Sequence, residues 1–360
     1  MSKPPEPNES RERAPEIDAV RRERELDVVR PPVLTGEAVR RVLRVCPELA
    51  GMRLDRFVMT QLRSTSRSRT QQIVALGAFT PAGTPLRKNH RVRAEERVVL
   101  WREAWDEPHV DAELPVLYED DALLAIDKPP HIAVHPTARH HRSTVTSLLA
   151  AARPGQHLTL AHRIDRETSG VLLLAKTRAA DRAVKVEFEE RNHVEKRYLA
   201  LAWGTAPFEL STCELPMELD STSSLRVKMR LAAPGAGLAA ATTFEVLGRR
   251  CAPGGARAGQ SYTLFRCTLH TGRQHQIRVH LRALGLPIVG DKLYGPDEEL
   301  LRRAADGTLD DTDLARLELD RHALHAELLA LTHPVTGRRL TITSKLYPDI
   351  QAFWDRLEEA

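Results

Sequence analysis

The order of apolar and polar residues along the chain predicts a mixture of strands and helices. The run from Val171 to Ala175 is apolar throughout and follows a Thr-Ser-Gly turn, which predicts a buried strand. Further strands are predicted where apolar runs lie between turn residues, at 97–101, 122–126, 197–203, 242–247 and 262–270. Apolar residues at helical spacing predict helices at 54–62, 146–152, 179–191 and 274–284, and another that is capped by Ser66 or Ser68 and ends at Gly77.

Breaks in this pattern divide the chain into four regions. Residues 1–36 contain six prolines and many charges of both signs, so we expect a mostly disordered tail with a short helix near Ile17–Val29. Residues 37–105 have the pattern of a small α/β module, and the acidic, proline-containing segment 106–116 is expected to be a linker. The remaining residues, 117–360, form a second and larger domain, since two domains suit a chain of 360 residues.

The composition excludes several classes of protein. No apolar run approaches the ~20 residues that a membrane span requires, and the N-terminal residues lack the apolar core of a secretory signal. Four scattered cysteines without a CxxC pair favour a reduced, cytoplasmic protein without a structural zinc site. A monomer is the expected oligomeric state.

Positive charge is concentrated in the small module. Residues 40–103 carry 14 Lys/Arg and 5 Asp/Glu, a net charge of +9, whereas residues 1–36 have a net charge of −1. Such a concentration is typical of a nucleic-acid-binding surface, although a solvated basic face is the alternative. The segment 295–320 is the opposite case, with 9 Asp/Glu against 3 arginines, and we expect a solvent-facing helical insertion turned away from nucleic acid.

Three distant polar residues are candidates for chemistry. Asp165 lies between Arg163 and Arg166 just before the predicted strand, and neighbouring cations would keep its carboxylate ionised and nucleophilic. Taken alone, such an Asp is more often a turn residue that binds its own backbone. Tyr198 in an apolar strand and Arg278 on the helix after Thr271-Gly272 could meet it, although each alone is more often a core aromatic or a surface charge.

Three histidines in an irregular loop raise the question of a metal site. His135, His140 and His141 lie among prolines and arginines without acidic residues that could complete a ligand set. We therefore interpret them as solvated loop histidines.

Five ordered motifs in the larger domain resemble those of the RluA-type pseudouridine synthases. The central motif is His162-Arg163-Ile164-Asp165 with Thr168-Ser169-Gly170, where Ile164 replaces the usual Leu with a side chain of similar volume. The others begin at Asp127-Lys128-Pro129-Pro130, Lys196-Arg197-Tyr198, Thr271-Gly272-Arg273-Gln274-His275-Gln276-Ile277-Arg278, and Arg321-His322-Ala323-Leu324-His325. The resemblance covers Leu117 to Asp349.

The resemblance implies a fold, an activity and a role for each matching residue. The fold is α+β, with a mixed, largely antiparallel sheet around a central cleft. Asp165 would be the nucleophile that isomerises uridine to pseudouridine, and its attack on the base or on the sugar stays open. Tyr198 would pack against the base and assist proton removal, Arg278 would pair with the aspartate, and Arg163 would fill the gap left by the flipped nucleotide. His162 and Arg273 are further substrate-binding candidates, and the reaction needs no cofactor or metal.

The small module resembles the S-four-type RNA-binding domain, also called the alpha-L motif. The matching residues are Arg53-Leu54-Asp55, the Ser-Arg-Ser-Arg stretch at 66–69, and Gly77. The turn at 78–83 departs from the Val-x-Val-Asn-Gly pattern of that family. Arg67 and Arg69 at the start of a helix are expected to bind phosphates.

The substrate is expected to be RNA, and the basic module favours large-subunit ribosomal RNA. A tRNA pseudouridine synthase is an alternative within the same class. A catalytically silent RNA-binding or ribosome-assembly protein is an alternative from another class. The joint presence of Asp165, Tyr198 and Arg278 argues against the silent protein, because it would have no chemical reason to keep all three.

We predict that deletion of residues 1–105 weakens RNA binding and flattens its dependence on salt. Each lost phosphate contact removes about 0.7–0.9 from the slope of log affinity against log salt concentration. A filter-binding titration at several salt concentrations measures both quantities, and deletion of residues 1–36 alone is the control. An unchanged affinity and slope after the longer deletion would show that the basic module is not the RNA anchor.

Overall fold

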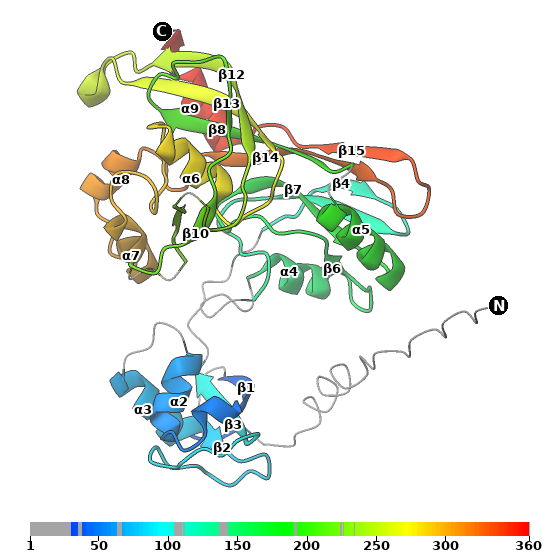
Figure 1. Ribbon diagram of the computed structural model, residues 1–360, viewed down its shortest axis with the longest axis vertical. Helices are drawn as coiled ribbons and strands as arrows, with labels where there is room; N and C mark the ends of the chain where they lie inside the picture. Colours follow the sequence, from blue (N-terminus) through cyan, green and yellow to red (C-terminus); the bar gives the residue numbers. More distant parts are fainter. Residues whose placement is uncertain are drawn as a thin grey trace, which may run out of the picture. The chain divides into compact units, whose positions relative to one another are not determined.

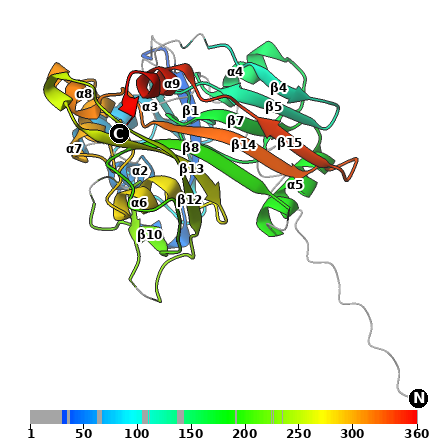
Figure 2. The same cartoon turned by 90° about the horizontal axis from the view of Figure 1, so that it is seen from above.

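The protein is described here from a computed structural model (Figures 1 and 2). The structure describes residues 30–34, 38–62, 67–103, 110, 112–136, 143–190, 193–223, 225, 227–233 and 235–359. The chain divides into two compact units between Glu107 and Pro108, a position inside the segment expected to be a linker. The helix expected near Ile17–Val29 lies outside the described residues.

The described residues of the first unit form two α-helices and a three-stranded antiparallel sheet with the order β1-β3-β2. Its elements are β1 (Ala38–Arg44), the 3-10 helix η1 (Pro47–Leu49), α2 (Leu54–Gln61), α3 (Arg67–Gly77), β2 (Ala78–Phe79) and β3 (Arg97–Glu103). The helices and sheet share one apolar core, in which Leu54, Phe57 and Val58 of α2 are fully buried. Gly77 does end its helix, and a Cβ there would lie 1.7 Å from the carbonyl oxygen of Trp101, so α3 packs directly onto β3.

A buried carboxylate joins the two helices of this unit. Asp55 on α2 pairs with Arg53 at 2.9 Å and accepts a hydrogen bond from the side-chain amide of Gln71 on α3 at 3.2 Å. The hydrogen bond from Arg53 lowers the pKa of Asp55 to about 2. The Arg-Leu-Asp sequence therefore orients α2 and α3 within the unit.

The second unit is built on one large mixed sheet flanked by helices. Its strands are β4 (Val116–Glu119), β5 (Leu123–Lys128), β6 (Thr159–Leu160), β7 (Ser169–Ala175), β8 (Glu195–Trp203), β9 (Leu210–Cys213), β10 (Met217–Leu219), β11 (Met229–Leu231), β12 (Thr242–Cys251), β13 (Ser261–Leu269), β14 (Leu324–Thr332), β15 (Arg339–Thr343) and β16 (Glu358–Glu359). Its helices are α4 (Val145–Ala152), α5 (Arg178–Glu190), the 3-10 helix η2 (Gly255–Arg257), α6 (Gln276–Ala283), α7 (Glu299–Asp306), α8 (Asp311–Leu317) and α9 (Pro348–Asp355).

The strand order of this sheet is β16-β12-β13-β8-β14-β7-β5-β4, and Figure 2 shows β12 to β4 side by side in this order. Strands β6, β9 and β15 pair with β7, β12 and β14, while β10 and β11 form a separate hairpin. Among the described pairs only β7 and β14 are parallel, which confirms the prediction of a mixed, largely antiparallel sheet. The expected central cleft stays a prediction.

The apolar run at 171–175 forms β7 because both of its faces are covered. Leu172 and Leu174 belong to the core on one face, which includes residues of α4, α6 and α9. Val171 and Leu173 belong to the core on the other face, where Ala180 and other residues of α5 pack. Each fully buried Leu or Val contributes roughly 1.5–3 kcal/mol. A strand buried on both faces has an unbroken apolar sequence instead of an alternating one.

Strand β14 lies between β7 and β8 and brings two predicted site elements together. Ala326 of β14 is opposite Gly170 of β7 on one side and opposite Tyr198 of β8 on the other. Neighbouring strands lie about 4.8 Å apart. The loop before β7 and Tyr198 on β8 are therefore separated by the width of one strand.

Two expectations about helices need correction. The helix predicted at 274–284 begins at Gln276, because the Gln276 side chain accepts hydrogen bonds from the Arg273 N–H and the Thr271 hydroxyl and closes a turn before it. The acidic segment 295–320 does contain two helices, α7 and α8. The expectation that this insertion faces solvent is wrong for one face of each helix, which is buried. Leu300 and Leu317 are fully buried there.

No helix in the described parts of the chain combines the length and the apolar character that crossing a lipid bilayer would need.

We predict that Gly170→Ala destabilises the protein more than Gly155→Ala. Both glycines have positive φ values, of 106° and 80°, so alanine costs about 1–2 kcal/mol at either position. A Cβ on Gly170 would also lie 2.3 Å from the carbonyl oxygen of Ala326, whereas a Cβ on Gly155 meets nothing within 4 Å. Overpacking of this kind adds about 1–3 kcal/mol. Urea unfolding measures the difference, and equal losses would show that β7 and β14 can separate.

Candidate active site

Asp165 lies in the loop of residues 161–168, and other residues of this loop fix its position by packing and hydrogen bonds. Ile164 is buried in the main core together with Tyr198 and Ile277. The backbone N–H of Thr168 donates to the carbonyl oxygen of Asp165 at 3.1 Å, and the Thr168 hydroxyl contacts Nε2 of His322 at 2.8 Å. Apolar packing on one side of Asp165 and hydrogen bonds on the other fix the position of its carboxylate.

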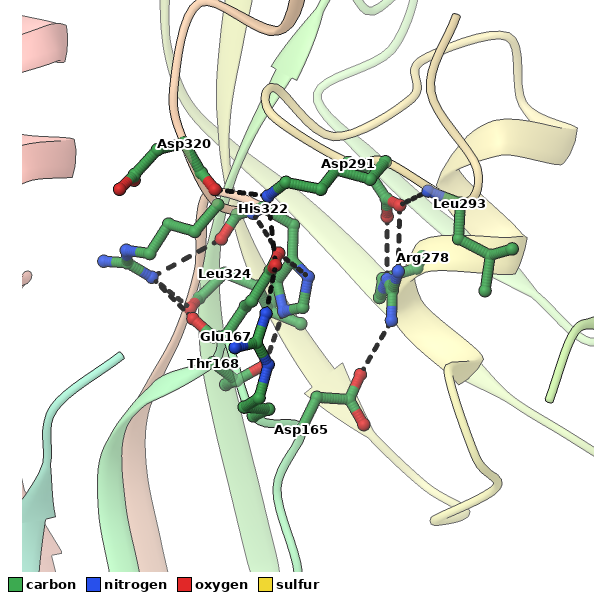
Figure 3. Close-up of polar contacts among 12 residues, drawn as sticks. Asp165, Glu167, Thr168, Arg278, Asp291, Leu293, Asp320, His322 and Leu324 are labelled. Atoms are coloured by element: carbon green, nitrogen blue, oxygen red, sulfur yellow. Dashed lines mark hydrogen bonds and ion pairs between the residues drawn. The ribbon is translucent and has the colours of Figure 1, made fainter. Parts of the chain in front are cut away.

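The carboxylate of Asp165 forms an ion pair with Arg278 of helix α6, as predicted. Nη1 of Arg278 lies 3.0 Å from Oδ2 of Asp165, while Nε and Nη2 bind both carboxylate oxygens of Asp291 at 2.7 and 2.9 Å (Figure 3). The Asp291 side chain is fully buried, whereas that of Asp165 is 30% exposed. The arginine is thus anchored in the interior and presents one N–H to an accessible carboxylate.

Arg278 keeps Asp165 ionised. Burial acts to raise the pKa of Asp165, but the surrounding positive charge outweighs it and the pKa is lowered. Burial lowers the pKa of His275 to about 4 and also lowers that of His322, so both rings are neutral at neutral pH. Arg278 is therefore the cation responsible, since the buried Asp291 raises its own pKa.

Tyr198 is close to the same carboxylate. It is 8% exposed, and burial together with the negative charge of Asp165 raises the pKa of its hydroxyl. Tyr198 is therefore a neutral phenol at neutral pH. Asp165, Tyr198 and Arg278, which come from three distant segments, are brought together as the sequence predicted, and their chemical roles stay predictions.

A buried cluster of charged residues behind Asp165 was missed by the sequence analysis. The Glu167 carboxylate pairs with Lys292 at 3.0 Å and accepts the His322 backbone N–H at 3.1 Å (Figure 3). Arg321, fully buried and paired with Asp349, donates to the Glu167 carbonyl oxygen at 3.0 Å. The one indication of this cluster in the sequence was the motif that contains Arg321 and His322. The sequence alone assigned no contact to these two residues.

A buried lysine holds the same loop from the side of β5. Nζ of Lys128 donates to the carbonyl oxygens of Pro129, Ile132 and Arg166 at 2.6, 3.1 and 3.1 Å. Its desolvation lowers the pKa of Lys128 to about 7. The carbonyls that follow Asp165 are thus bound by the buried side chains of Lys128 and Arg321, which restricts the movement of the loop.

The other predicted site residues differ in their surroundings. His162 accepts the Leu173 backbone N–H at 3.1 Å and stacks on Phe188, and burial lowers its pKa to about 3, so its described contacts are structural. The Arg163 side chain is exposed and makes no hydrogen bond or ion pair with any residue that the structure describes, while its backbone forms a hydrogen bond with His162. Nε of Arg273 donates to the Ala239 carbonyl oxygen at 3.0 Å.

Arg67 and Arg69 are exposed at the start of α3, in the first unit. His140 and His141 lie outside the described residues. In the described ranges, no group of three or more His, Cys, Asp or Glu side chains could hold a metal ion.

This chain is similar to known proteins in both sequence and structure. The sequence profile of the family described as RNA pseudouridylate synthase matches residues 122–283. The chain is 33% identical to ribosomal large subunit pseudouridine synthase D of Xanthomonas campestris, over 86% of this chain and 90% of that protein. It is 30% identical to ribosomal large subunit pseudouridine synthase C of Escherichia coli K12, over 89% of this chain and 97% of that protein. Human RNA pseudouridylate synthase domain containing 4 is a similar solved structure, with a TM-score of 0.50, 26% identity, and coverage of 68% of this chain and 93% of that one.

The fold and these relatives define an RNA pseudouridylate synthase, an isomerase that acts on RNA. Within this class, the chain belongs to the RluA family, which confirms the resemblance seen in the motifs.

We predict that Asp291→Asn destabilises the protein by about 3–5 kcal/mol, because it leaves the buried Arg278 without its main counter-ion. Chemical unfolding at pH 7 measures the change. Glu299→Gln is the control, since Glu299 forms an exposed pair with Arg302 on α7 that contributes about 0–1 kcal/mol at most. Equal losses for the two variants would show that Asp165 alone can compensate the arginine.

Proposed function

We propose that this protein isomerises uridine to pseudouridine in large-subunit ribosomal RNA, with Asp165 as the nucleophile. The observation that carries the proposal is the accessible, ionised Asp165 carboxylate 3.0 Å from an arginine that is anchored in the interior. The choice of RNA is supported by the names of the Xanthomonas and Escherichia relatives, which are ribosomal large subunit pseudouridine synthases.

In the proposed reaction the bond between the ribose and N1 of the base breaks, the base rotates, and a bond to C5 forms. The proton on C5 is lost and N1 gains one, so atoms and electrons balance without a redox partner. Asp165 attacks as a carboxylate because Arg278 keeps it ionised, and the bond that it forms to the substrate breaks again before the product leaves, which restores the carboxylate. The neutral Tyr198 beside it stacks on the ring of the base and assists the removal of the proton.

The target base must leave its helical stack before it can reach Asp165. Arg163 suits the role of filling the gap, since its side chain is exposed two residues before Asp165 and has no partner among the described residues. Arg273 is a further substrate contact in this proposal.

The first unit is proposed to be an S-four-type domain that holds RNA. Its support is the concentration of basic residues and the exposed Arg67 and Arg69 at the start of α3. Backbone N–H groups at the start of a helix and arginine side chains both bind phosphate oxygens. This domain would supply affinity, while the larger unit supplies the chemistry.

We predict that Asp165→Asn abolishes pseudouridine formation and leaves RNA affinity near that of the wild type. Asparagine keeps the size of the side chain but is not a nucleophile. Single-turnover assays on ribosomal RNA fragments measure activity, and filter binding measures affinity. Asp355→Asn, which changes an exposed carboxylate at the end of α9, is the control and should be fully active. Full activity of Asp165→Asn would contradict the mechanism.

Mapping pseudouridines in cellular RNA tests the substrate. Cells that lack the protein should lose specific pseudouridines from large-subunit ribosomal RNA, and wild-type protein but not Asp165→Asn should restore them. Loss from tRNA alone would favour a tRNA pseudouridine synthase. Restoration of growth or ribosome assembly by Asp165→Asn without any pseudouridine would favour the catalytically silent RNA-binding protein.

A further inference from the structure

His275 has a backbone conformation that an ordinary side chain avoids. Its φ and ψ are 58° and 17°, in the left-handed region, immediately before helix α6. This conformation costs roughly 1–2 kcal/mol for a residue with a Cβ. In this conformation the His275 imidazole lies between Tyr294 and Asp165. The strained residue therefore contacts the surroundings of the proposed nucleophile.

The hydrogen bonds around Tyr294 determine where His275 carries its proton. Nδ1 of His275 lies 2.9 Å from the Tyr294 hydroxyl oxygen, which also accepts the Met229 backbone N–H at 2.8 Å. A phenol has a single proton to donate. If Nδ1 carried the proton, the tyrosine O–H would have no acceptor among the described residues. The complementary arrangement has Tyr294 donating to Nδ1, and the imidazole proton is then on Nε2.

Nε2 of His275 faces the same carboxylate oxygen that Arg278 binds. It lies 3.9 Å from Oδ2 of Asp165, and Nη1 of Arg278 lies 3.0 Å from that oxygen. The other oxygen, Oδ1, accepts no hydrogen bond from a residue that the structure describes, and Figure 3 shows only one Asp165 oxygen bound to Arg278. Only Arg278 is within hydrogen-bond distance of Oδ2, and Nε2 of His275 faces the same oxygen from beyond that distance. Both groups lie on the Oδ2 side of the carboxylate, which distinguishes two oxygens that are otherwise chemically equivalent.

We propose that Tyr294 and His275 are positioning residues that hold a neutral N–H donor opposite Oδ2 of Asp165, so that Oδ1 is the oxygen that attacks the substrate. This inference rests on the proposed role of Asp165. The donor must be neutral, because a second cation beside Asp165 would stabilise the carboxylate and reduce its nucleophilicity. Burial and the charge of Arg278 keep His275 uncharged, although Asp165 and Asp291 act in the opposite direction.

Tyr294→Phe is the variant that separates this role from packing. The Tyr294 ring is buried, and the Arg278 guanidinium lies over it, 5.0 Å from its centroid. Phenylalanine keeps this ring and loses the hydroxyl that fixes the imidazole proton, together with its hydrogen bond from the Met229 backbone N–H. Tyr118→Phe is the matched control. Tyr118 lies on β4, and its hydroxyl donates to Asp120 at 2.8 Å instead of to a residue of the site.

Nitrogen NMR of the full-length protein with labelled histidine reads the position of the proton directly. We expect the wild type and Tyr118→Phe to carry it on Nε2 of His275, and Tyr294→Phe to show a mixture of both neutral forms. Single-turnover rates should fall about tenfold in Tyr294→Phe, the size of one lost hydrogen bond, with KM changed less than about twofold. Tyr118→Phe should match the wild type.

Variants of His275 itself give an independent result. Asn tolerates the left-handed conformation and offers an N–H, whereas Ala does neither. We expect His275→Asn to retain several times the rate of His275→Ala. A wild-type His275 that carries its proton on Nδ1, or a Tyr294→Phe variant with the wild-type rate, would overturn the inference. A wild type that forms no pseudouridine would overturn the proposed function instead, and the two failures are thereby distinguished.

Discussion

The second unit depends on one arrangement of charge, a buried arginine placed between two carboxylates. Arg278 binds the fully buried Asp291 with two hydrogen bonds and the partly exposed Asp165 with one. A lone arginine at this depth would be strongly destabilising, and a lone Asp165 would tend to become protonated. Asp291 therefore stabilises the charge of Arg278 in the interior, and Arg278 stabilises the charge of Asp165 at the accessible end. The accessible end is where a substrate can meet a carboxylate that stays ionised.

Such a pair is useful only if the carboxylate does not move. The loop that carries Asp165 has few residues, and its backbone carbonyls are bound by Lys128 and Arg321. Glu167 adds a carboxylate that is itself satisfied by Lys292 and by the backbone of His322. Buried ions of this kind contribute little net stability, but they specify one geometry. The loop is thus positioned by the same kind of interaction that keeps its aspartate charged.

The sequence predicted the features that an apolar pattern or a family motif carries. The unbroken apolar run predicted β7, whose two faces are both covered, and the motifs indicated that Asp165 and Arg278 would pair although they are far apart in the sequence. Features that neither a pattern nor a motif carries were missed. The left-handed turn at His275 depends on a capping contact of Gln276, and the role of Glu167 depends on Lys292, 125 residues later in the sequence. Nothing in the order of residues gives such contacts directly, and the stacking of His162 on Phe188 was likewise not predicted.

The position of β14 between β7 and β8 also determines when the site can exist. A ribosome synthesises Asp165 long before Arg278, 113 residues later, and Thr168 long before His322, 154 residues later. Until residues 324–326 are available, β7 lacks its neighbour on one side and presents an unpaired edge. Non-local pairings of this kind form slowly, and larger proteins form them through intermediates. The nascent chain therefore completes the surroundings of Asp165 only after residues 324–326 have been synthesised.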